Sequence, residues 1–292
     1  RVVNKYILHN RSILFSSHDE VKKFLEKRSI ENSKKHQQPA TLNVKSNLDK
    51  LTLNDMQVFR FNFRHEKNQK ILYLHGGYNT LQPSPFHWRL LDKLTLNTLH
   101  EVVLPIYPKS PDYHYLETFK AIRDVYNQLV EEVGADNIVM MGDGSGGGLA
   151  LSFVQSLIND NQEVPRKLFL LSPLLDATLT NPNITQTLEE NDILVSRFGV
   201  HQLMKSWAND LPLSDARISP LYGTLKGLPP IYMYGGGREI LSPDMHAFTH
   251  ALEECGNDVE FKEYPKMVHD FPIYPIRQSH KVLKHITKSI LE

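Results

Sequence analysis

Residues 138–150 read Ile-Val-Met-Met-Gly-Asp-Gly-Ser-Gly-Gly-Gly-Leu-Ala, and this stretch constrains the fold more than any other part of the chain. Its first four residues are apolar and include β-branched side chains, which is typical of a buried strand. The glycines that follow allow the backbone to turn sharply and to approach neighbouring chain closely. The stretch therefore predicts a strand that turns directly into a helix.

The same alternation of strand and helix patterns continues on both sides. The predicted strands are Gln57–Phe63, Ile71–Leu74, Glu101–Tyr107, Ile138–Gly142, Lys167–Leu171, Ile231–Tyr234 and Val259–Glu263. The predicted helices include Leu116–Val133, one that starts at Ser242 and a C-terminal one that starts at Ser279. Short β-rich runs that alternate with stretches of helical period form strand–helix–strand crossovers. The pattern predicts an α/β fold with a mostly parallel central sheet covered by helices.

A second glycine motif, Leu74-His-Gly-Gly-Tyr78, directly follows one of these predicted strands. Consecutive glycines let the backbone come close to a ligand and aim N–H groups at it. The alternative is a tight turn at the end of a strand, without contact to any ligand. The motif alone does not separate the two interpretations.

Together the two glycine motifs resemble those of the hormone-sensitive-lipase-like esterases, which have the α/β-hydrolase fold. Shorter matches extend this resemblance from about residue 71 to the C-terminus. The resemblance implies an oxyanion hole made by backbone amides of the loop Gly76, Gly77 and Tyr78. It implies a third amide from Ser145, or from Gly146 if the second motif is shifted by one residue.

The second motif departs from the family at one position. The usual family run is Gly-Asp-Ser-x-Gly-Gly, and alignment on Gly142 and Asp143 places Gly144 where the catalytic serine belongs. The elbow that carries this serine requires small residues two positions before and after it. Gly142 and Gly146 meet this requirement around Gly144, whereas a nucleophile at Ser145 would have Asp143 at the first of these positions. We therefore expect Gly144 at the nucleophile-elbow position.

A glycine adopts the backbone of the elbow easily but has no side chain that attacks a carbonyl. Three explanations are open. The chain is a natural protein without the nucleophile, or a serine was changed to glycine to trap a ligand. In the third, the elbow is shifted by one residue and Ser145 is the catalytic nucleophile.

The other two members of a catalytic triad match the family better. Glu239 lies in a glycine-rich segment after a predicted strand and occupies the position of the family's acid. His269 lies in Met267-Val-His-Asp-Phe-Pro272, which matches the family's histidine loop. A carboxylate on one imidazole nitrogen fixes the tautomer and leaves the other nitrogen to accept a proton. The rival carboxylates Asp244 and Asp270 are more simply explained by helix capping and by loop hydrogen bonding.

Composition excludes several classes of protein. The 292 residues contain 33 Lys+Arg and 33 Asp+Glu, so no polycationic surface for nucleic acid is expected. No apolar stretch reaches the roughly 20 residues of a membrane-spanning helix, and no integral membrane segment is expected. The single cysteine, Cys255, cannot form an intramolecular disulfide, and no secretory leader pattern opens the sequence, so a cytoplasmic location fits best. Metal-ligand spacings and a phosphate-binding loop are absent, and no cofactor is implied.

We expect a single α/β-hydrolase domain over residues 1–292, with cap elements at about 1–48 and 178–213. Apolar residues at helical spacing in both segments are compatible with a lid, but also with peripheral packing helices that have no role in ligand choice. A small-molecule ester or acyl compound is the expected ligand. The sequence leaves a monomer or a homodimer open.

The resemblance implies a carboxylesterase or lipase-type serine hydrolase of short or medium acyl esters. This activity is expected to be absent in the chain as given if Gly144 replaces the serine. The alternative is a non-catalytic protein that binds a small molecule, as the gibberellin receptors of plants do on the same fold with an altered triad.

Overall fold

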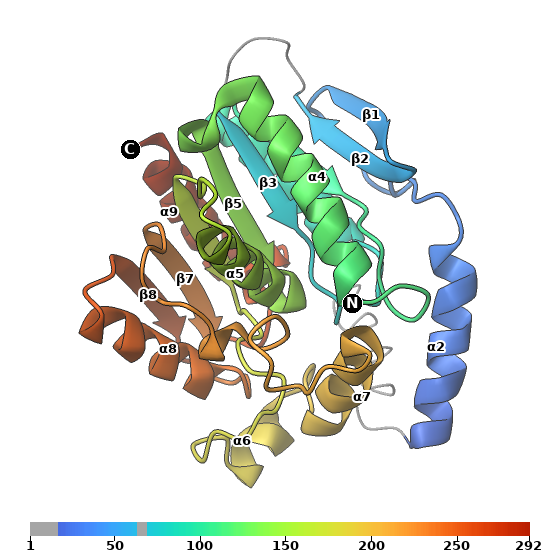
Figure 1. Ribbon diagram of the computed structural model, residues 1–292, viewed down its shortest axis with the longest axis vertical. Coiled ribbons are helices and arrows are strands. Elements are labelled where there is room, and N and C mark those ends of the chain that lie inside the picture. Colours follow the sequence, from blue (N-terminus) through green and yellow to red (C-terminus); the bar gives the residue numbers. More distant parts are fainter. Residues whose placement is uncertain (1–16, 63–68) are drawn as a thin grey trace.

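The structure, a computed structural model, describes residues 17–62 and 69–292. Eight strands form one sheet in the order β1-β2-β4-β3-β5-β6-β7-β8 (Figure 1). Their bounds are β1 Leu48–Leu53, β2 Met56–Phe61, β3 Lys70–Leu74, β4 Glu101–Pro105, β5 Ile138–Asp143, β6 Lys167–Leu171, β7 Ile231–Gly236 and β8 Val259–Tyr264. The pairs β1–β2 and β2–β4 are antiparallel, and the other neighbours are parallel. The predicted mostly parallel sheet is confirmed.

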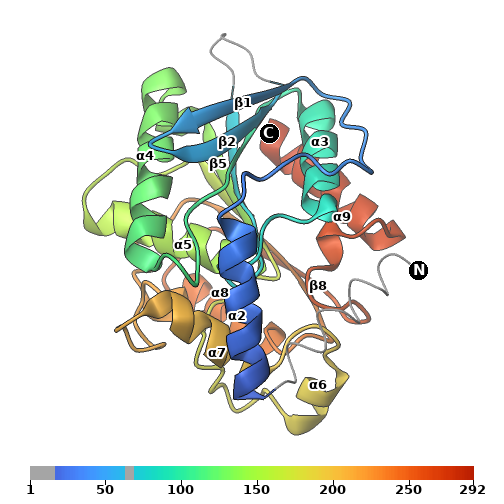
Figure 2. The same ribbon diagram turned by 90° about the vertical axis from the view of Figure 1, so that its right-hand side faces the viewer.

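Helices cover both faces of this sheet. The helices are α2 His18–Asn32, α3 Pro85–Thr98, α4 Tyr115–Val133, α5 Gly144–Asn159, α6 Gln186–Asn191, α7 Arg197–Ala208, α8 Ser242–Glu254 and α9 Arg277–Leu291. In Figure 2, α4 and α5 lie on one side of the sheet, and α3 and α9 lie on the other. Every residue of β3 and β5 is buried in consequence. A strand that is covered on both faces has a nearly continuous apolar sequence, and this pattern is why both strands could be predicted.

The predicted elements agree with the observed ones to within about two residues at their ends. The first predicted strand ends at Phe61, and its last predicted residue, Phe63, lies outside the described residues. The C-terminal helix begins at Arg277 rather than at Ser279, whose hydroxyl donates to the Phe271 carbonyl at 2.6 Å. Strand β1 and helix α3 were not predicted. In β1 the partly buried positions alternate irregularly with exposed ones, so no clear strand period is visible.

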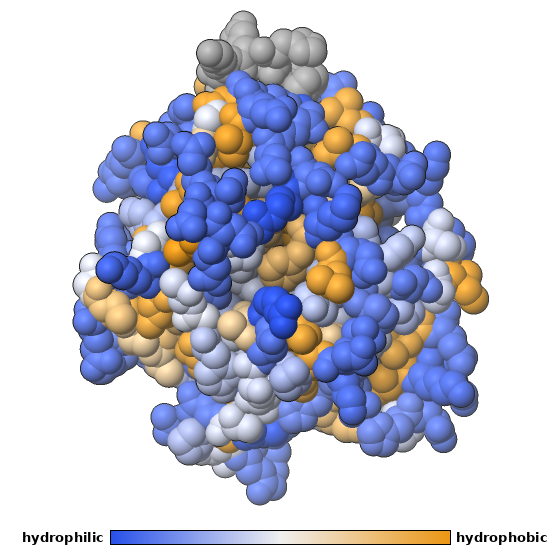
Figure 3. Space-filling model, in the orientation of Figure 1, coloured by the Kyte–Doolittle hydropathy of each residue, from blue (hydrophilic) through white to orange (hydrophobic). Residues whose placement is uncertain are grey.

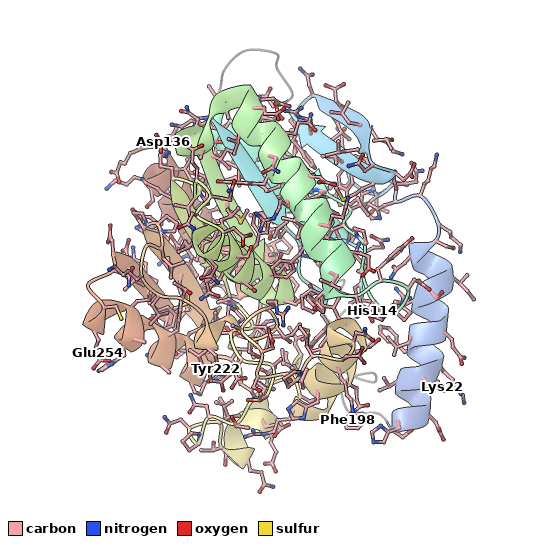
Figure 4. All side chains as sticks on the ribbon, in the orientation of Figure 1. Lys22, His114, Asp136, Phe198, Tyr222 and Glu254 are labelled. Atoms are coloured by element: carbon pink, nitrogen blue, oxygen red, sulfur yellow. The ribbon has the colours of Figure 1, made fainter. Side chains whose placement is uncertain are left out.

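The two segments predicted as cap elements lie side by side. The described part of the first contains α2, and the second contains α6 and α7, which lie beyond the ends to which the arrows of β7 and β8 point (Figure 1). The His18 Nδ1 atom is 3.1 Å from Gln202 Oε1. The ring of Phe198, labelled in Figure 4, meets the ring of His18 edge-on at a centroid distance of 5.2 Å. Residues 1–16 of the first predicted segment lie outside the described residues.

The surface in Figure 3 is mostly hydrophilic, and its hydrophobic residues form small groups between polar ones. Within residues 17–62 and 69–292, no helix has the length and apolar character needed to cross a membrane. The parallel strands all end on the same side of the sheet, and the loops that follow their carboxyl ends lie together there. Ligand sites of α/β sheets form at the carboxyl ends of the parallel strands.

Candidate active site

The glycine-rich stretch forms the turn predicted from the sequence. Strand β5 ends at Asp143 and helix α5 begins at Gly144, with no residue between them. Gly144 has a φ of +50°, in the left-handed region that favours glycine. A Cβ atom at Gly142 would collide with the Gly146 carbonyl, and one at Gly146 would collide with the Leu74 carbonyl. Close backbone packing therefore explains why both flanking positions are glycine.

Position 144 faces the predicted histidine. A Cβ atom built on Gly144 would lie 3.4 Å from His269 Nε2 and 3.2 Å from Asp270 Oδ2. The hydroxyl of Ser145 lies toward the loop after β3, where it accepts a hydrogen bond from the Asn79 amide at 3.1 Å. A side chain at position 144, rather than the present Ser145 rotamer, thus points at the imidazole.

Asp143 ties the elbow to the loop after β3. Its Oδ1 accepts hydrogen bonds from the Tyr73 hydroxyl at 2.7 Å and from the Gly76 amide at 2.9 Å. Its Oδ2 lies 2.9 Å from Nε2 of His87. Nδ1 of His87 accepts from the Ser84 amide at 2.9 Å, so the proton of the neutral ring is on Nε2 and is donated to Asp143. The sequence analysis did not identify Tyr73 or His87.

These contacts distinguish one of the predicted oxyanion-hole amides, which is bound to Asp143, from the others. The Gly76 amide is already used by Asp143, whereas Gly77 and Tyr78 form the turn itself, with φ values of +115° and +58°. The amides of Ser145 and Gly146 are in the first turn of α5, where helix geometry offers no intrahelical acceptor. Gly146 packs its α-carbon against the carbonyls of Leu74 and His75. The first turn of the helix and the loop after β3 therefore bring backbone N–H groups to the same region.

A small cavity of about 60 Å³ lies between these groups. Its polar lining includes Gly76, Gly77, Tyr78, Gly144, Ser145, His269 and Asp270. Its apolar lining includes Leu174, Leu194, Val195, Val200, Leu241, Ile273 and Tyr274. Three of these residues, Leu194, Val195 and Val200, belong to the segment predicted as a cap. This segment therefore contributes part of the cavity wall.

The predicted acid and histidine are in direct contact. His269 Nδ1 lies 2.7 Å from Glu239 Oε2. The other carboxylate oxygen of Glu239 accepts from the Ser172 hydroxyl at 2.8 Å and from the Gly236 amide at 2.5 Å. The Ser172 hydroxyl in turn accepts from the Asp270 amide at 3.1 Å. Glu239 is completely buried, and every contact holds it in one orientation toward the imidazole.

The second nitrogen of His269 is in contact with a carboxylate that the sequence analysis had explained by loop bonding. Asp270 Oδ2 lies 3.1 Å from His269 Nε2. This contact depends on the left-handed backbone of Asp270, which has a φ of +53°. The other rival carboxylate, Asp244, is in α8 and accepts from Asn181 at 2.9 Å. Of the two rivals, Asp270 is thus the one that touches the predicted histidine.

The flanking carboxylates change the protonation of the imidazole. Burial alone lowers the pKa of His269, but the negative charges of Asp270 and Glu239 outweigh it and hold that pKa well above its usual value. Burial raises the pKa of Asp270 to about 6, His269 opposes this rise, and Asp143 and Glu239 add to it. At neutral pH the favoured state is an imidazolium between two carboxylates.

One buried aspartate links the cap segment to the segment that carries Glu239. Asp192 Oδ1 accepts from the Leu194 and Val195 amides, and its Oδ2 accepts from the Ile240 amide, each at 2.9 Å. Burial raises the pKa of Asp192 to about 6, against the lowering effect of His269 and of these amides. The cap segment is therefore attached next to the acid itself.

Among residues 17–62 and 69–292, no group of three or more His, Cys, Asp or Glu side chains is arranged to hold a metal ion. The titratable side chains around the cavity are instead paired with one another or with backbone groups.

The fold and this site together define a hydrolase of the α/β class. Residues 71–273 match the family described as having the alpha/beta hydrolase fold, and the chain belongs to this family. The resemblance to the hormone-sensitive-lipase-like esterases and lipases is confirmed. An esterase of the bacterial hormone-sensitive lipase family shares the fold at a TM-score of 0.82 and 20% identity, with 99% of this chain and 96% of that chain covered.

Individual relatives are named as esterases and lipases. An esterase of Acinetobacter venetianus is 33% identical over 208 residues, which cover 70% of this chain and 68% of the relative. A triacylglycerol lipase of Mycobacterium tuberculosis is 29% identical over 221 residues, or 75% of this chain. The match spans 46% of that lipase, about half of its length.

A solved structure covers nearly the full length of the chain. The crystal structure of a candidate esterase from Staphylococcus aureus is 64% identical, with a TM-score of 0.97, and covers 100% of this chain and 99% of that one. The chain is a carboxylic ester hydrolase by resemblance, over the whole region that carries the site.

Proposed function

We propose that the chain has the site of a serine carboxylesterase for short or medium acyl esters, from which the nucleophile is missing at Gly144. The observation that carries this proposal is the position of Gly144. A side chain there would start 3.4 Å from His269 Nε2, within reach of the nitrogen that accepts the proton of a nucleophile. The small cavity with apolar walls supports a short acyl group as the ligand.

In this proposal a serine at position 144 displaces Asp270 from Nε2 of His269, and the neutral imidazole accepts the serine proton as the serine attacks the ester carbonyl. Glu239 orients the imidazole. The amides of Gly77, Tyr78 and Ser145 hold the oxyanion in this proposal, because these residues line the cavity and the Gly76 amide is already bound to Asp143. Ser145 contributes its backbone, since its hydroxyl is bound to the Asn79 amide.

The test is hydrolysis of p-nitrophenyl acetate and butyrate by the chain as given and by Gly144→Ser. We expect a gain on the order of 10³-fold or more from the serine, which the further change His269→Asn removes. Because the new Cβ lies 3.2 Å from Asp270 Oδ2, Gly144→Ser/Asp270→Gly is measured as well, so that crowding does not mask the gain. If neither serine variant hydrolyses either ester, the esterase proposal is wrong.

The position of Ser145 is tested in the same assay. If the chain as given is active and Ser145→Ala abolishes this activity together with acyl transfer to the protein, the elbow is shifted and Ser145 is the nucleophile. If Ser145→Ala leaves acylation of the Gly144→Ser variant in place, position 144 is the elbow.

A cytoplasmic location and a homodimer stay predictions. Light scattering on the purified chain tests the homodimer.

A second function, binding of a small molecule without catalysis, is favoured by one observation. Asp270 Oδ2 contacts His269 Nε2 and so occupies the atom that would otherwise act as the base. Under this alternative the cavity keeps its cap and its amides but serves recognition only. A thermal-shift screen with short acyl compounds tests it, because a ligand that binds the native state raises the melting temperature. Absence of any stabilising compound contradicts the alternative.

A further inference from the structure

The carboxylate of Asp270 lies where the hydroxyl of a catalytic serine would meet the histidine. Its Oδ2 is 3.1 Å from His269 Nε2 and 3.2 Å from the point at which a Cβ of residue 144 would be. Gly144 leaves this space open. The histidine therefore has an acidic partner on each nitrogen, and the partner on Nε2 belongs to the lining of the cavity.

The second oxygen of the same carboxylate has no partner. Asp270 Oδ1 is buried, and none of the described residues 17–62 and 69–292 makes a hydrogen bond to it. A buried carboxylate oxygen without a donor is costly, so it favours a donor supplied from the cavity. A water molecule is the smallest such donor, and the cavity has room for it.

We propose that Asp270 is a general base which directs a water molecule at an ester bound in this cavity, so that the chain hydrolyses short acyl esters in one displacement, without an acyl-enzyme. The inference rests on the proposed ester-binding cavity and its amides. It differs from the serine mechanism in the attacking atom, which is a water oxygen rather than a side-chain oxygen.

The proton balance closes within the pair Asp270 and His269. The water gives a proton to Asp270 Oδ1 while its oxygen bonds to the carbonyl carbon, and the amides of Gly77 and Tyr78 hold the oxyanion. When the tetrahedral intermediate collapses, the bond to the alcohol oxygen breaks, and this oxygen takes the proton of His269 Nε2. The products are the carboxylic acid and the alcohol. Rotation of the Asp270 carboxyl group then returns its proton to Nε2.

The charges around the pair suit both roles. Burial raises the pKa of Asp270 to about 6, which His269 opposes and which Asp143 and Glu239 increase, so the group is ionised at neutral pH but more basic than an exposed aspartate. Burial lowers the pKa of His269, but Asp270 and Glu239 raise it by more, so the imidazole keeps the proton that the leaving alcohol needs. A general base works best with a pKa near the working pH.

The test compares p-nitrophenyl acetate turnover by the chain as given with Asp270→Asn and Asp270→Gly. Both replacements tolerate the φ of +53° at this position, and circular dichroism and melting curves check the fold. We expect slow turnover above buffer in the chain as given and a loss of about 10²-fold in both variants. Added formate is expected to restore turnover to Asp270→Gly, because it supplies the missing carboxylate.

Asp244→Asn is the matched control, because Asp244 is also a buried aspartate whose pKa burial raises to about 6, but it binds Asn181 outside the cavity. We expect this variant to keep the turnover of the chain as given. Mass spectrometry during turnover is expected to find no acylated protein, and a phosphonate ester is expected not to inhibit.

Three results overturn the inference: no turnover above buffer, turnover that Asp270→Asn retains, or an acyl adduct on the protein. The inference and the proposed function fail separately. If the chain as given is inactive while Gly144→Ser is active, only the role of Asp270 as base is wrong. If no variant with or without a serine is active, the ester-binding cavity itself is wrong.

Discussion

The two sides of the His269 ring differ in how they are built. On the Nδ1 side, Glu239 is completely buried and bound by the imidazole, by a serine hydroxyl and by a backbone amide. On the Nε2 side, the elbow has its backbone geometry but no side chain, and Asp270 is the group in contact. The acid side is thus held by side-chain hydrogen bonds, whereas the elbow is held by close packing of glycines.

This difference shows that the acid and the elbow are held mainly by different contacts, with Ser172 and the hydrogen bond from the Leu174 amide to the Gly144 carbonyl as links between them. The acid side depends on loops after β6, β7 and β8, and the elbow depends on β5, α5 and the loop after β3. Loss of a nucleophile removes no contact on which the acid side relies. A site can therefore lose its nucleophile and keep the contacts that hold its acid and histidine.

The largest expected effect concerns the acid side. In the Gly144→Ser background, Glu239→Gln is expected to lower kcat for p-nitrophenyl butyrate by about 10³- to 10⁴-fold, because the amide no longer stabilises the imidazolium or fixes its tautomer. Initial rates at saturating ester measure this loss. A fall of less than tenfold would mean that the intact acid side contributes nothing to the reaction.

The second effect concerns the packing of the elbow. Gly146→Ala is expected to lower the free energy of unfolding by roughly 3–5 kcal/mol, because its Cβ would collide with the carbonyls of Leu74 and His75. Gly144→Ala is the matched control and is expected to cost only about 1–2 kcal/mol for its left-handed backbone. Urea unfolding measures both. Equal losses at the two positions would contradict the idea that backbone packing holds the elbow.

The third effect is the pH dependence contributed by Asp270. Burial raises its pKa from 3.8 to about 6 in the folded protein, so the folded state binds more protons than the unfolded state between these values. Stability from this group is therefore present below about pH 4 and lost as the pH rises to about 6, by at most about 3 kcal/mol. Asp270→Asn is expected to flatten this part of the profile of melting temperature against pH. Parallel profiles of the two proteins over pH 4 to 6 would contradict the buried placement of Asp270.

The smallest effect concerns Ser172, which joins the two sides. Its hydroxyl donates to Glu239 and accepts from the Asp270 amide, so Ser172→Ala leaves one carboxylate oxygen with fewer donors and one amide unpaired. We expect a loss of about 1–2 kcal/mol in the free energy of unfolding. Ser156→Ala is a control for the same chemical change, because Ser156 is half-buried on α5 away from the site and its hydroxyl also donates a hydrogen bond, to the Phe153 carbonyl at 2.7 Å. If both variants unfold at the same urea concentration, Ser172 does not join the two sides.

The sequence predicted the sheet because its central strands are covered on both faces and are apolar except for Lys70 at the start of β3 and Asp143 at the end of β5. It did not predict β1, an edge strand with mixed polar and apolar positions, whose stability depends on pairing with β2. Local pattern reports burial, and an edge strand is only partly buried. Helix α3 was not predicted either, because its buried residues face more than one neighbour and include the polar His87 and Asp92.

The candidate site was predictable where a residue carries a motif. Glu239 and His269 have such a context and meet in the structure. Asp270 had the same context but was assigned to loop bonding, because only its left-handed backbone turns the carboxylate onto Nε2. Ser172 and Asp192 act through contacts with segments far away in the chain, and the partners in these contacts are not visible in the local sequence. The position of Ser172 directly after a buried strand is a signal that could have identified it.

Asp192 joins the cap segment to the segment that carries the acid Glu239. Its carboxylate binds the amides of Leu194 and Val195, which belong to the cavity wall, and also the amide of Ile240, the residue next to Glu239. The Asp192 side chain therefore connects the cavity wall directly to the residue that follows Glu239. If the wall moves outward to admit a ligand, the Asp192 carboxylate must release either the two wall amides or the Ile240 amide, so opening of the cavity is coupled to the alignment of the acid.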